Sequence, residues 1–416
     1  MTKTVLGVIA DDFTGASDIA SFLTENGLQT VQMNGVPSEP LQSAVDAIVI
    51  SLKSRSNPVA EAVEQSLSAL NWLQANGCNQ FYFKYCSTFD STEKGNIGPV
   101  TDALMKALGT DFTVVTPALP VNGRTIFNGY LFVGNVLLNE SGMQNHPITP
   151  MKDANLVRLM DAQSQGKTGL VVSSDVFQGA EKVKARFAEL KSQGFSYAVV
   201  DAVDNSQLAV LAEAVADLKL VTGGSGLGAY MAARLSGGKK GTNAIVPPKG
   251  KTVVLSGSCS VMTNKQVNTY KAKAPALQLD VEQALNNSNY VQELYDWVQN
   301  NLNSPLAPMV YATVPPDVLK EIQAKFGADI ASHTIENTFA KLAEKLQQSG
   351  VNNFITAGGE TSSIVVQQLG FHGFQIGKQI APGVPWLKAL NAPVFLALKS
   401  GNFGKEDFFE FAQSMS

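Results

Sequence analysis

A repeated alternation of short apolar runs with helix-type segments limits the folds open to this chain. The apolar runs are rich in β-branched residues, which suits strands covered on both faces, as in a parallel sheet. Segments with helical periodicity separate them, so the pattern predicts βαβ units and an α/β fold. In the first part of the chain, the predicted strands cover 5–10, 45–51, 81–85, 114–117, 169–173, 197–202 and 218–221. The predicted helices cover 16–25, 59–76, 97–108, 153–165, 178–193, 206–219 and 229–235.

One segment, 236–251, breaks this alternation. It is rich in glycine and proline and its apolar periodicity disappears, which marks a domain boundary. A chain of 416 residues is also too long for one ordinary core. We therefore predict two α/β domains with mainly parallel sheets, 1–236 and 251–416, joined by a linker at 237–250. In the second domain, strands are predicted at 252–256, 308–313, 354–357, 373–380 and 394–399, and helices at 260–272, 288–302 and 332–349.

A β-hairpin is predicted inside the first domain, at 124–132. Its centre, Asn128-Gly129, lies between apolar and β-branched residues. This dipeptide suits a two-residue hairpin turn, because both positions accept a positive φ.

Two adjacent carboxylates, Asp11 and Asp12, follow the first predicted strand. In an open α/β sheet, ligands bind at the carboxyl ends of the strands, which is where this pair falls. Asp is also an ordinary helix N-cap residue, so a tight turn with a cap explains one of the two. A cap needs only one carboxylate, and the second favours an active-site element.

A polar loop, 84–96, follows the third predicted strand and falls at the same edge of the sheet. Lys84 lies within the apolar run, where burying an unpaired ammonium is costly, and a bound carboxylate or phosphate would pair it. A solvated loop would explain the other polar residues. Arg124 is a second candidate for an anion, because its guanidinium suits bidentate contacts with carboxylates. The residues predicted to bind the substrate or line its pocket are Asp11, Lys84, Ser87, Asp90, Ser91 and Arg124.

Glycine-rich turns follow several of the predicted strands. The turn at 222–228 is either a close-packed junction of strand and helix or a ligand site. The turn at 358–363 leads into a helix, whose first N–H groups and dipole can hold an anion without a cationic side chain. It lacks the G-K-[ST] of a Walker A loop.

Two further turns, 256–260 and 399–404, follow strands of the same second domain as the turn at 358–363. Turns at one edge of a sheet can converge on one ligand, so we predict that these three turns bind the phosphates of a nucleotide. The residues predicted to contact the nucleotide are Ser258, Gly358, Gly359, Glu360, Thr361, Gly401 and Gly404.

Composition and charge argue against several classes of protein. The formal net charge is −4, whereas a nucleic-acid binder usually has a basic face. No apolar run is long enough for a membrane span, and no signal peptide is visible. The three cysteines and three histidines have no metal-ligand spacing, so we predict a reducing cytoplasmic location and no zinc site. The sequence leaves a homodimer open.

Three motifs resemble the signatures of the four-carbon acid sugar kinases. They are the string Ile-Ala-Asp-Asp-Phe-Thr-Gly-Ala at 9–16, the string at 84–92 with Gly95-Asn96, and Ala-Gly-Gly-Glu-Thr-Ser at 357–362. The resemblance covers essentially the whole chain. It implies an N-terminal domain that binds a sugar acid and a C-terminal domain that binds ATP, with both sites in the cleft between the domains. It also implies phosphorylation of the terminal hydroxyl of the acid, with ATP and Mg²⁺.

Two segments favour one branch of that family. The form Lys-Tyr-Cys-Ser-Thr-Phe-Asp-Ser-Thr at 84–92 and the loop His-Pro-Ile-Thr-Pro at 146–150 most resemble 3-oxo-tetronate 4-kinases. Threonate and erythronate kinases tend to have Arg at the position of Lys94. A threonate or erythronate 4-kinase is the alternative within the family, and the stereochemistry of the acid is left open.

Phosphoryl transfer to an alcohol needs an aligned hydroxyl and an acceptor for its proton. Asp12 is the predicted base, with Asp11 beside it to raise one pKa of the pair by like-charge repulsion. Asp90 is the alternative base. The ligands of Mg²⁺ cannot be named, because this ion usually takes one or two carboxylates plus phosphates and water.

Two other functions compete with a kinase. A phosphotransferase that works through an aspartyl-phosphate uses Asp-x-Asp, whereas Asp11 and Asp12 are adjacent and would point in opposite directions on a strand end. A non-catalytic sugar-acid sensor would explain Lys84 and Arg124, but it gives no reason for the phosphate-type turns of the second domain.

Overall fold

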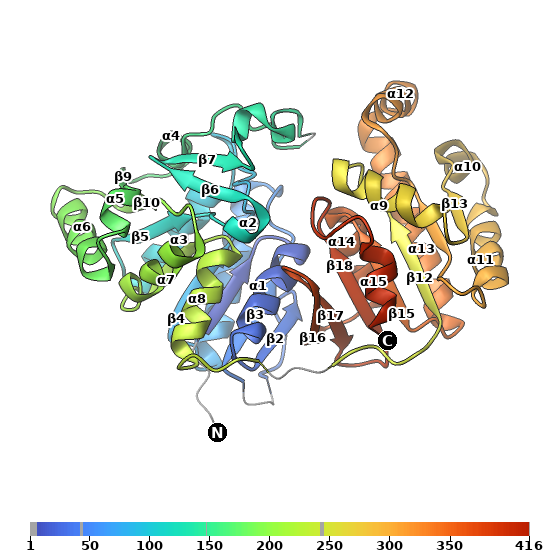
Figure 1. The fold of residues 1–416 in the computed structure, drawn as a ribbon, viewed down its shortest axis with the longest axis horizontal. Coiled ribbons are helices and arrows are strands. Elements are labelled where there is room, and N and C mark those ends of the chain that lie inside the picture. Colours follow the sequence, from blue (N-terminus) through green and yellow to red (C-terminus); the bar gives the residue numbers. More distant parts are fainter. Residues whose placement is uncertain (1–5, 42–44, 147, 242–244, 416) are drawn as a thin grey trace. The chain divides into compact units, whose positions relative to one another are not determined.

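The computed structural model describes residues 6–41, 45–146, 148–241 and 245–415. The chain forms two compact units, Met1–Thr242 and Asn243–Ser416, which are described in turn (Figure 1). Parts of three predicted segments lie outside the described residues: Val5 of the first strand, Pro147 of the 146–150 loop, and 242–244 of the linker. The limits that we assigned to the domains and the linker stay a prediction.

All strands of the large sheet in the N-terminal unit are parallel. Their order is β2 (Thr30–Asn34), β3 (Ala47–Ser51), β1 (Leu6–Ala10), β4 (Gln80–Lys84), β11 (Leu220–Gly223), β5 (Thr113–Thr116), β10 (Tyr197–Val200) and β9 (Thr168–Val171). Every residue of β1 and β3 is buried. Because successive side chains point to opposite faces, both faces of the sheet are covered, which confirms the predicted α/β layering.

Helices connect these strands in the predicted alternation. They are α1 (Phe13–Glu25), α2 (Val59–Ala75), α3 (Ile97–Leu108), α4 (Leu156–Gln163), α5 (Ser173–Val176), α6 (Ala180–Ser192), α7 (Asn205–Ala214) and α8 (Ser225–Leu235). α1 packs against α8, and α2 packs against α3. α4 and α7 are shorter than predicted, and α5 is an additional turn of helix ahead of α6.

The predicted hairpin forms a small antiparallel sheet of its own. Its strands are β6 (Arg124–Phe127), β7 (Tyr130–Val133) and β8 (Val136–Leu137). Phe127 pairs with Tyr130, and the two turn residues have φ angles of 49° for Asn128 and 76° for Gly129. This turn confirms the hairpin. Short 3₁₀ helices flank it at η1 (Pro120–Asn122), η2 (Leu138–Glu140) and η3 (Gly142–Asn145).

The C-terminal unit has five parallel strands followed by an antiparallel pair. The order is β13 (Ala276–Gln278), β14 (Met309–Tyr311), β12 (Thr252–Ser256), β15 (Asn353–Ala357), β18 (Phe395–Lys399), β17 (Val384–Ala389) and β16 (Gly373–Ala381). Its helices are α9 (Val261–Lys271), α10 (Val281–Asn286), α11 (Tyr290–Asn301), α12 (Pro316–Phe326), α13 (Ala328–Gln348), α14 (Gly359–Leu369) and α15 (Phe408–Ser414).

The core of the C-terminal unit surrounds Trp386, which is fully buried. Residues from the parallel strands, from β17 and from α15 pack in the same cluster, among them Val254, Ile355, Ala397 and Phe409. The antiparallel pair therefore belongs to the core and is not a separate flap.

Several elements were not predicted. β2 has the sequence Thr-Val-Gln-Met-Asn, and its central Gln32 is fully buried, so the strand lacks the continuous apolar run that marks its neighbours. β13, β17, α10, α12 and α15 were also missed. Among the helices that the structure describes, none is long and apolar enough to cross a membrane.

Candidate functional site

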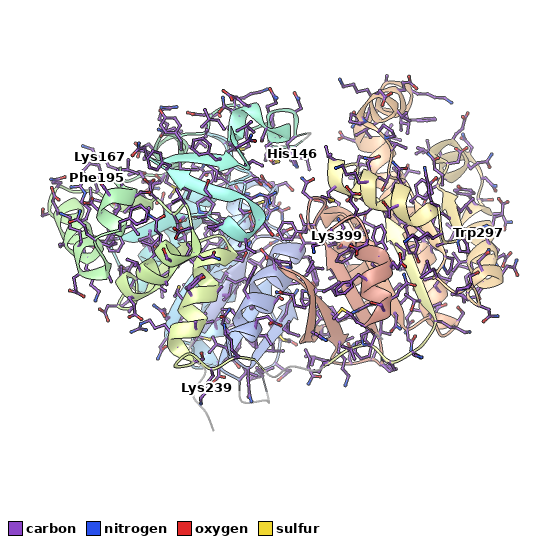
Figure 2. The ribbon with its side chains drawn as sticks, viewed as in Figure 1. His146, Lys167, Phe195, Lys239, Trp297 and Lys399 are labelled. Atoms are coloured by element: carbon purple, nitrogen blue, oxygen red, sulfur yellow. The ribbon has the colours of Figure 1, made fainter. Side chains whose placement is uncertain are left out.

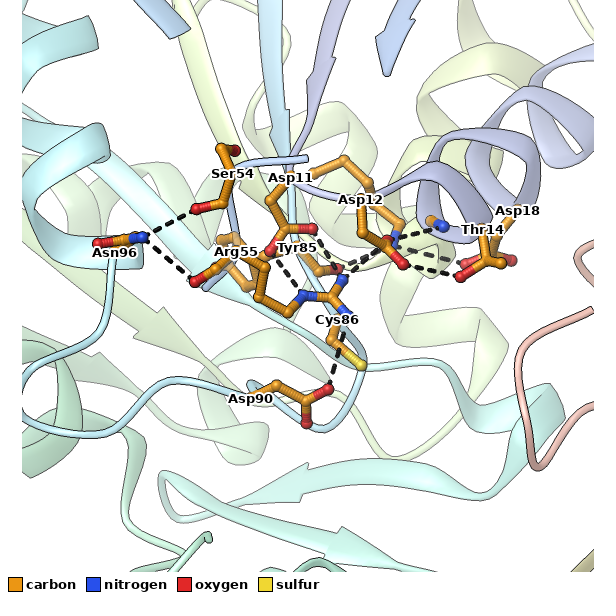
Figure 3. Close-up of polar contacts among 12 residues, drawn as sticks. Asp11, Asp12, Thr14, Asp18, Ser54, Arg55, Tyr85, Cys86, Asp90 and Asn96 are labelled. Atoms are coloured by element: carbon orange, nitrogen blue, oxygen red, sulfur yellow. Dashed lines mark hydrogen bonds and ion pairs between the residues drawn. The ribbon is translucent and has the colours of Figure 1, made fainter. Parts of the chain in front are cut away.

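The carboxyl ends of β1, β3 and β4 bring four charged side chains together in the N-terminal unit. Asp11 and Asp12 follow β1, Asp90 follows β4, and Arg55 follows β3 (Figure 3). Ligands of open α/β sheets bind at this edge. Asp11, Arg55 and Asp90 also line one small pocket. The structure therefore brings the predicted carboxylates together around an arginine that the sequence reasoning missed.

Arg55 is the centre of this cluster. Its Nε and Nη2 donate to the two carboxylate oxygens of Asp11 at 3.0 and 2.8 Å, and Nη2 also donates to Asp12 Oδ1 at 2.8 Å. Its Nη1 lies 3.7 Å from Asp90 Oδ2. A guanidinium that donates two parallel hydrogen bonds to one carboxylate holds that carboxylate in the plane of the guanidinium. Arg55 therefore sets the positions of both carboxylates that follow β1.

Asp12 is the N-cap of α1 as well as a partner of Arg55. Its Oδ1 accepts from Gly15 N and its Oδ2 accepts from Thr14 Oγ1, both at 2.8 Å. The predicted cap is therefore present, and the same carboxylate also contacts Arg55. Its role as an active-site element stays a prediction. The argument that Asp11 and Asp12 point in opposite directions is wrong, because β1 ends at Ala10 and both carboxylates lie beyond it, on one Arg55 nitrogen.

Burial and charge move the pKa values of the two neighbouring carboxyls apart. Burial raises the pKa of Asp11 above its ordinary value; the charge of Asp12 adds to this effect and Arg55 opposes it. Burial also acts to raise the pKa of Asp12, but Arg55, Lys84 and the bonds from Thr14 and Gly15 outweigh it and hold that pKa below its ordinary value. Like-charge repulsion does contribute at Asp11, as expected, but burial is the larger cause. Asp12 therefore stays ionised to a lower pH than Asp11 does.

Lys84 is paired within the protein. Its Nζ lies 3.6 Å from Asp18 Oδ2 of α1 and donates to the carbonyl oxygen of Tyr85 at 2.8 Å. The Lys84 side chain is only 2% exposed. The inference that Lys84 needs a bound anion as its partner is therefore wrong, because Asp18 already provides a carboxylate. Asp18 Oδ2 also accepts from Ser225 Oγ at 2.6 Å.

Arg124 is the predicted anion ligand that lacks a carboxylate partner. Its Nη1 donates to the carbonyl oxygen of Asn122, whereas its buried Nε has no hydrogen-bond partner among the described residues. No carboxylate of the described chain lies within 4 Å of it. Burial lowers the pKa of Arg124, and the neighbouring carboxylates of Asp90 and Asp18 oppose that change. The guanidinium of Arg124 therefore has an N–H group, at Nε, that could donate a hydrogen bond to an anion.

The loop after β4 is held by its own contacts. Thr88 Oγ1 donates to Asp90 Oδ1 at 2.7 Å. Phe89, which lies between these two residues, is fully buried and has a φ of 60°, which is unusual outside glycine. Ser91 Oγ donates to Gln163 Oε1 at 2.9 Å and thus has a structural partner. Ser87 is also buried. Of the polar residues named here, Asp90 joins the Arg55 cluster, because its Oδ2 lies 3.7 Å from Arg55 Nη1.

Asn96 fixes the loop that carries Arg55. Its Nδ2 lies 2.8 and 3.2 Å from the carbonyl oxygens of Ser54 and Arg55 (Figure 3). It also lies 2.9 Å from the carbonyl oxygen of Asn57. Asn96 belongs to the second of the quoted motifs, and this contact gives a physical reason for an amide there. The clue to Arg55 in the sequence was its place just beyond the strand at 45–51, at the same sheet edge as Asp11.

The three predicted nucleotide turns meet at the carboxyl edge of the second sheet. Gly358 N donates to Lys399 O at 2.8 Å, and Gly257 N and Ser258 N donate to Ala357 O at 2.9 and 3.1 Å. Gly358, at the start of α14, has a φ of 121°. A Cβ at Gly401 would lie 2.7 Å from Ser258 Oγ. The turns after β12, β15 and β18 thus touch one another, as their placement on one sheet edge predicted.

The residues predicted to contact the nucleotide differ in their exposure and packing. Thr361 is buried, and its Oγ1 lies against Gly257. Glu360 is exposed in the first turn of α14. Gly404 has a φ of 79° and packs against the ring of Phe408, so its glycine has a structural explanation. Gly359 begins α14.

The turn at 222–228 is a close-packed junction. A Cβ at Gly223, Gly224 or Gly226 would lie within 2.6 Å of the carbonyl oxygens of Thr116, Pro117 or Ala118. Ser225 of this turn is bonded to Asp18. Of the two readings left open by the sequence, the packing one fits these contacts.

A larger pocket lies elsewhere in the N-terminal unit. It has a volume of about 430 Å³ beside β9 and is lined by residues that include Arg158, Arg186 and Phe195. Phe195 is labelled in Figure 2. Each of the two arginines is already paired, Arg158 with Asp153 and Arg186 with Glu189. None of the residues predicted to bind substrate lines it, and we assign it no role.

Comparisons with known proteins identify both parts of the chain. A family model described as "Sugar-binding N-terminal domain" matches residues 6–231, and one described as "Nucleotide-binding C-terminal domain" matches residues 253–409. The chain is 79% identical over 411 residues to a 3-oxo-tetronate kinase of Actinobacillus succinogenes, with 99% of each protein covered.

Two comparisons with Haemophilus influenzae give the same result. The chain is 79% identical over 411 residues to the 3-oxo-tetronate kinase of that organism, covering 99% of this chain and 100% of the relative. A crystal structure of a Haemophilus influenzae protein matches with a TM-score of 0.80 and 79% identity, over 98% of this chain and 99% of the other. The resemblance read from the three motifs is confirmed: this chain belongs to the 3-oxo-tetronate kinase family, with a sugar-binding N-terminal domain and a nucleotide-binding C-terminal domain.

Proposed function

We propose that this chain transfers the γ-phosphoryl group of ATP to the C4 hydroxyl of a 3-oxo-tetronate. The family relationship supports this reaction, since relatives with 79% identity over nearly the whole chain are named as 3-oxo-tetronate kinases. The observation that carries the proposal is the Arg55 cluster, which holds three carboxylates at the ligand edge of the sugar-binding domain. That arrangement offers acceptors for hydroxyl groups and an ionised base, which a kinase acting on an alcohol needs.

Arg124 is our choice for the ligand of the substrate carboxylate. It is the predicted cation without a carboxylate partner among the described residues, and its buried Nε has an unused N–H. A carboxylate would accept from that N–H and supply the missing counter-charge. Lys84 is the weaker candidate, because Asp18 already pairs it. The predicted contribution of Ser91 is also weaker, because its hydroxyl already donates to Gln163 Oε1. Ser87 remains a predicted contact.

Asp12 is our choice for the base that accepts the proton of the C4 hydroxyl. Its carboxylate is ionised at neutral pH because its pKa is held below its ordinary value, and Arg55 fixes its orientation. Asp11 is gripped by the same guanidinium through both oxygens, so we assign it a supporting place beside the substrate. Asp90 remains the alternative base.

The nucleotide-binding domain would hold the ATP phosphates at the three turns that meet beside Gly358, Ser258 and Gly401. Backbone N–H groups at the start of α14 and the serine hydroxyls of the 256–260 turn suit phosphate oxygens. The expectation that sugar acid and nucleotide meet in a cleft between the domains stays a prediction.

Mg²⁺ fits this arrangement only if the phosphates of the nucleotide supply most of its ligands. No group of three or more His, Cys, Asp or Glu side chains in the described parts of the chain could hold a metal ion. Mg²⁺ bound to nucleotide needs few protein ligands, and hydroxyls such as that of Ser258 are the groups available. Its chemistry would be to neutralise charge on the phosphates during transfer.

A substrate screen tests the proposal. ADP release is measured with 3-oxo-tetronate, threonate and erythronate, each at a fixed ATP concentration. We expect 3-oxo-tetronate to give the highest kcat/KM. A higher value with threonate or erythronate would move the chain to the alternative activity of the family. Acid binding without any ADP release would leave a non-catalytic sugar-acid sensor.

A further inference from the structure

Two buried lysines occupy equivalent places in the two domains. Lys84 is the last residue of β4 and Lys399 is the last residue of β18. Each Nζ donates to the carbonyl oxygen of the next residue, at 2.8 Å for Lys84 and 2.9 Å for Lys399. Lys84 has the carboxylate of Asp18 as its counter-ion. Lys399 has none within 4 Å among the residues described.

The ammonium of Lys399 (labelled in Figure 2) contacts two carbonyl oxygens of the turn that follows β18. It is fully buried, and its three neighbours are Gly401 O at 2.8 Å, Ser400 O at 2.9 Å and Thr263 Oγ1 at 3.1 Å. Neutral oxygens therefore satisfy all three N–H groups without neutralising the charge. A buried ammonium without a carboxylate is costly. A negative charge from a bound ligand would therefore stabilise the charged form of Lys399.

The same turn belongs to the three that meet at the nucleotide edge. The main-chain oxygen of Lys399 accepts from Gly358 N, and Gly401 lies against the hydroxyls of Ser258 and Ser260. Lys399 thus sits beneath the place where we put the phosphates. Because its N–H groups are all engaged, it would act on them as a charge and not as a direct hydrogen-bond donor.

Other ionisable groups on the surrounding elements do not neutralise Lys399. On α9, Lys265 pairs with Glu406 of the segment before α15, at 3.4 Å. The 256–260 turn contributes the Cys259 thiol, whose pKa burial raises, and α14 contributes the exposed Glu360. Lys405 and Asp407, ahead of α15, are exposed as well. Burial alone lowers the pKa of Lys399, to about 7.

We propose that Lys399 is the buried counter-charge for the nucleotide phosphates, and that the protein takes up a proton at this side chain when nucleotide binds. This inference rests on the proposed nucleotide site. Without nucleotide, the cost of burial leaves a large share of the side chain neutral near pH 7. Bound phosphate favours the charged form, so binding and protonation promote each other.

The direction of the pH effect follows from that linkage. Nucleotide binds best to the protonated form, so affinity is highest near and below pH 7 and falls as the pH rises. A phosphate charge about 6 Å away, at an effective dielectric constant near 20, raises the proton affinity of the amine by about 100-fold. ADP affinity should then fall by about 25-fold between pH 7 and 9, with an uptake of roughly 0.8 proton at pH 8.

The test is calorimetric titration of the full chain with ADP at pH 8, in buffers with different ionisation enthalpies. At this pH the phosphates of ADP are already ionised, since the second pKa of a phosphate monoester is about 6. The variants are Lys399→Met, which keeps the length and removes the charge, and Lys405→Met as a control that removes an exposed lysine nearby. We expect wild type and Lys405→Met to take up the proton, and Lys399→Met to bind ADP more weakly with no uptake.

A purely structural role for Lys399 would lower ADP affinity in Lys399→Met but would not create proton uptake in the wild type. Tight ADP binding by wild type with no uptake, or uptake that persists in Lys399→Met, would overturn the inference and leave the nucleotide site standing. An affinity of wild type that does not change between pH 7 and 9 would overturn it even if Lys399→Met does not fold. Failure of wild type to bind ADP at all would refute the proposed nucleotide site together with it.

Discussion

Asp12→Asn separates the two roles of Asp12, because Asn caps a helix about as well as Asp does. The start of α1 should therefore keep the bond from Gly15 N to the remaining oxygen, and Thr14 Oγ1 can accept from the new amide N–H. The negative charge and the proton acceptor are lost. General base catalysis contributes about 10²–10⁴-fold, which corresponds to about 2.7–5.5 kcal/mol of barrier. We expect kcat to fall by that factor with KM for ATP nearly unchanged.

The chain offers a matched control in Asp204. It is the N-cap of α7 and accepts from Gln207 N at 3.0 Å, as Asp12 accepts from Gly15 N at the start of α1. Asp204 has no contact with Arg55, so Asp204→Asn should keep the kcat of the wild type. Both variants are assayed by continuous ADP release while the acid and ATP are varied in turn.

The pH profile gives a second check on Asp12. Because its pKa lies below the ordinary value of 3.8, the ionised form is present above that pKa and is lost only as the pH falls below it. Asp12 should therefore cause no acid limb in kcat above about pH 5. A near-normal kcat in Asp12→Asn would refute the assignment, and a large loss in Asp90→Asn would then move the base to Asp90.

Three further predictions concern the same domain. Arg55→Met and Asp11→Asn should be strongly non-additive, with a coupling of about 3 kcal/mol in kcat/KM because the pair shares two charge-assisted bonds; additive losses would contradict this. Arg124→Met should raise KM for the acid by about tenfold or more and leave KM for ATP unchanged, whereas Arg158→Met, at a surface ion pair, should change neither; a change confined to ATP would reverse the assignment. Asn96→Ala should destabilise the domain by about 1–3 kcal/mol, seen as a lower thermal midpoint in calorimetry, and an unchanged midpoint would count against its role in holding the Arg55 loop.

The fold was largely predictable because it depends on a pattern that repeats. Strands covered on both faces need apolar side chains at successive positions, so runs such as Leu6–Ala10 and Ala47–Ser51 stand out from the helical segments, whose apolar residues recur every three or four positions. β2 shows the limit of this reasoning. Its buried Gln32 interrupts the apolar run. The segment becomes a strand because it pairs with β3, and this pairing cannot be seen in the local sequence.

The site was predictable where a residue directly follows a strand. Asp11 and Asp12 were found in this way, and the turns of the second domain met as their sheet order required. Arg55 was missed because its position at the site depends on Asn96, which binds the backbone around it. Such a contact joins segments far apart in the sequence, and no local pattern announces it.

Lys84 and Lys399 show why the charges of a site are harder to predict than its location. Both are lysines at the end of a buried strand, each followed by a polar turn, and in sequence the two contexts are equivalent. Only the packing of α1 places Asp18 within 3.6 Å of Lys84 Nζ, whereas the elements around Lys399 bring neutral oxygens alone. An unpaired buried ammonium would be stabilised by a bound anion, but Lys84 is already paired with Asp18. Lys399 is the lysine that has neutral oxygen partners alone, and it lies in the nucleotide-binding domain, whose ligand carries the greater negative charge.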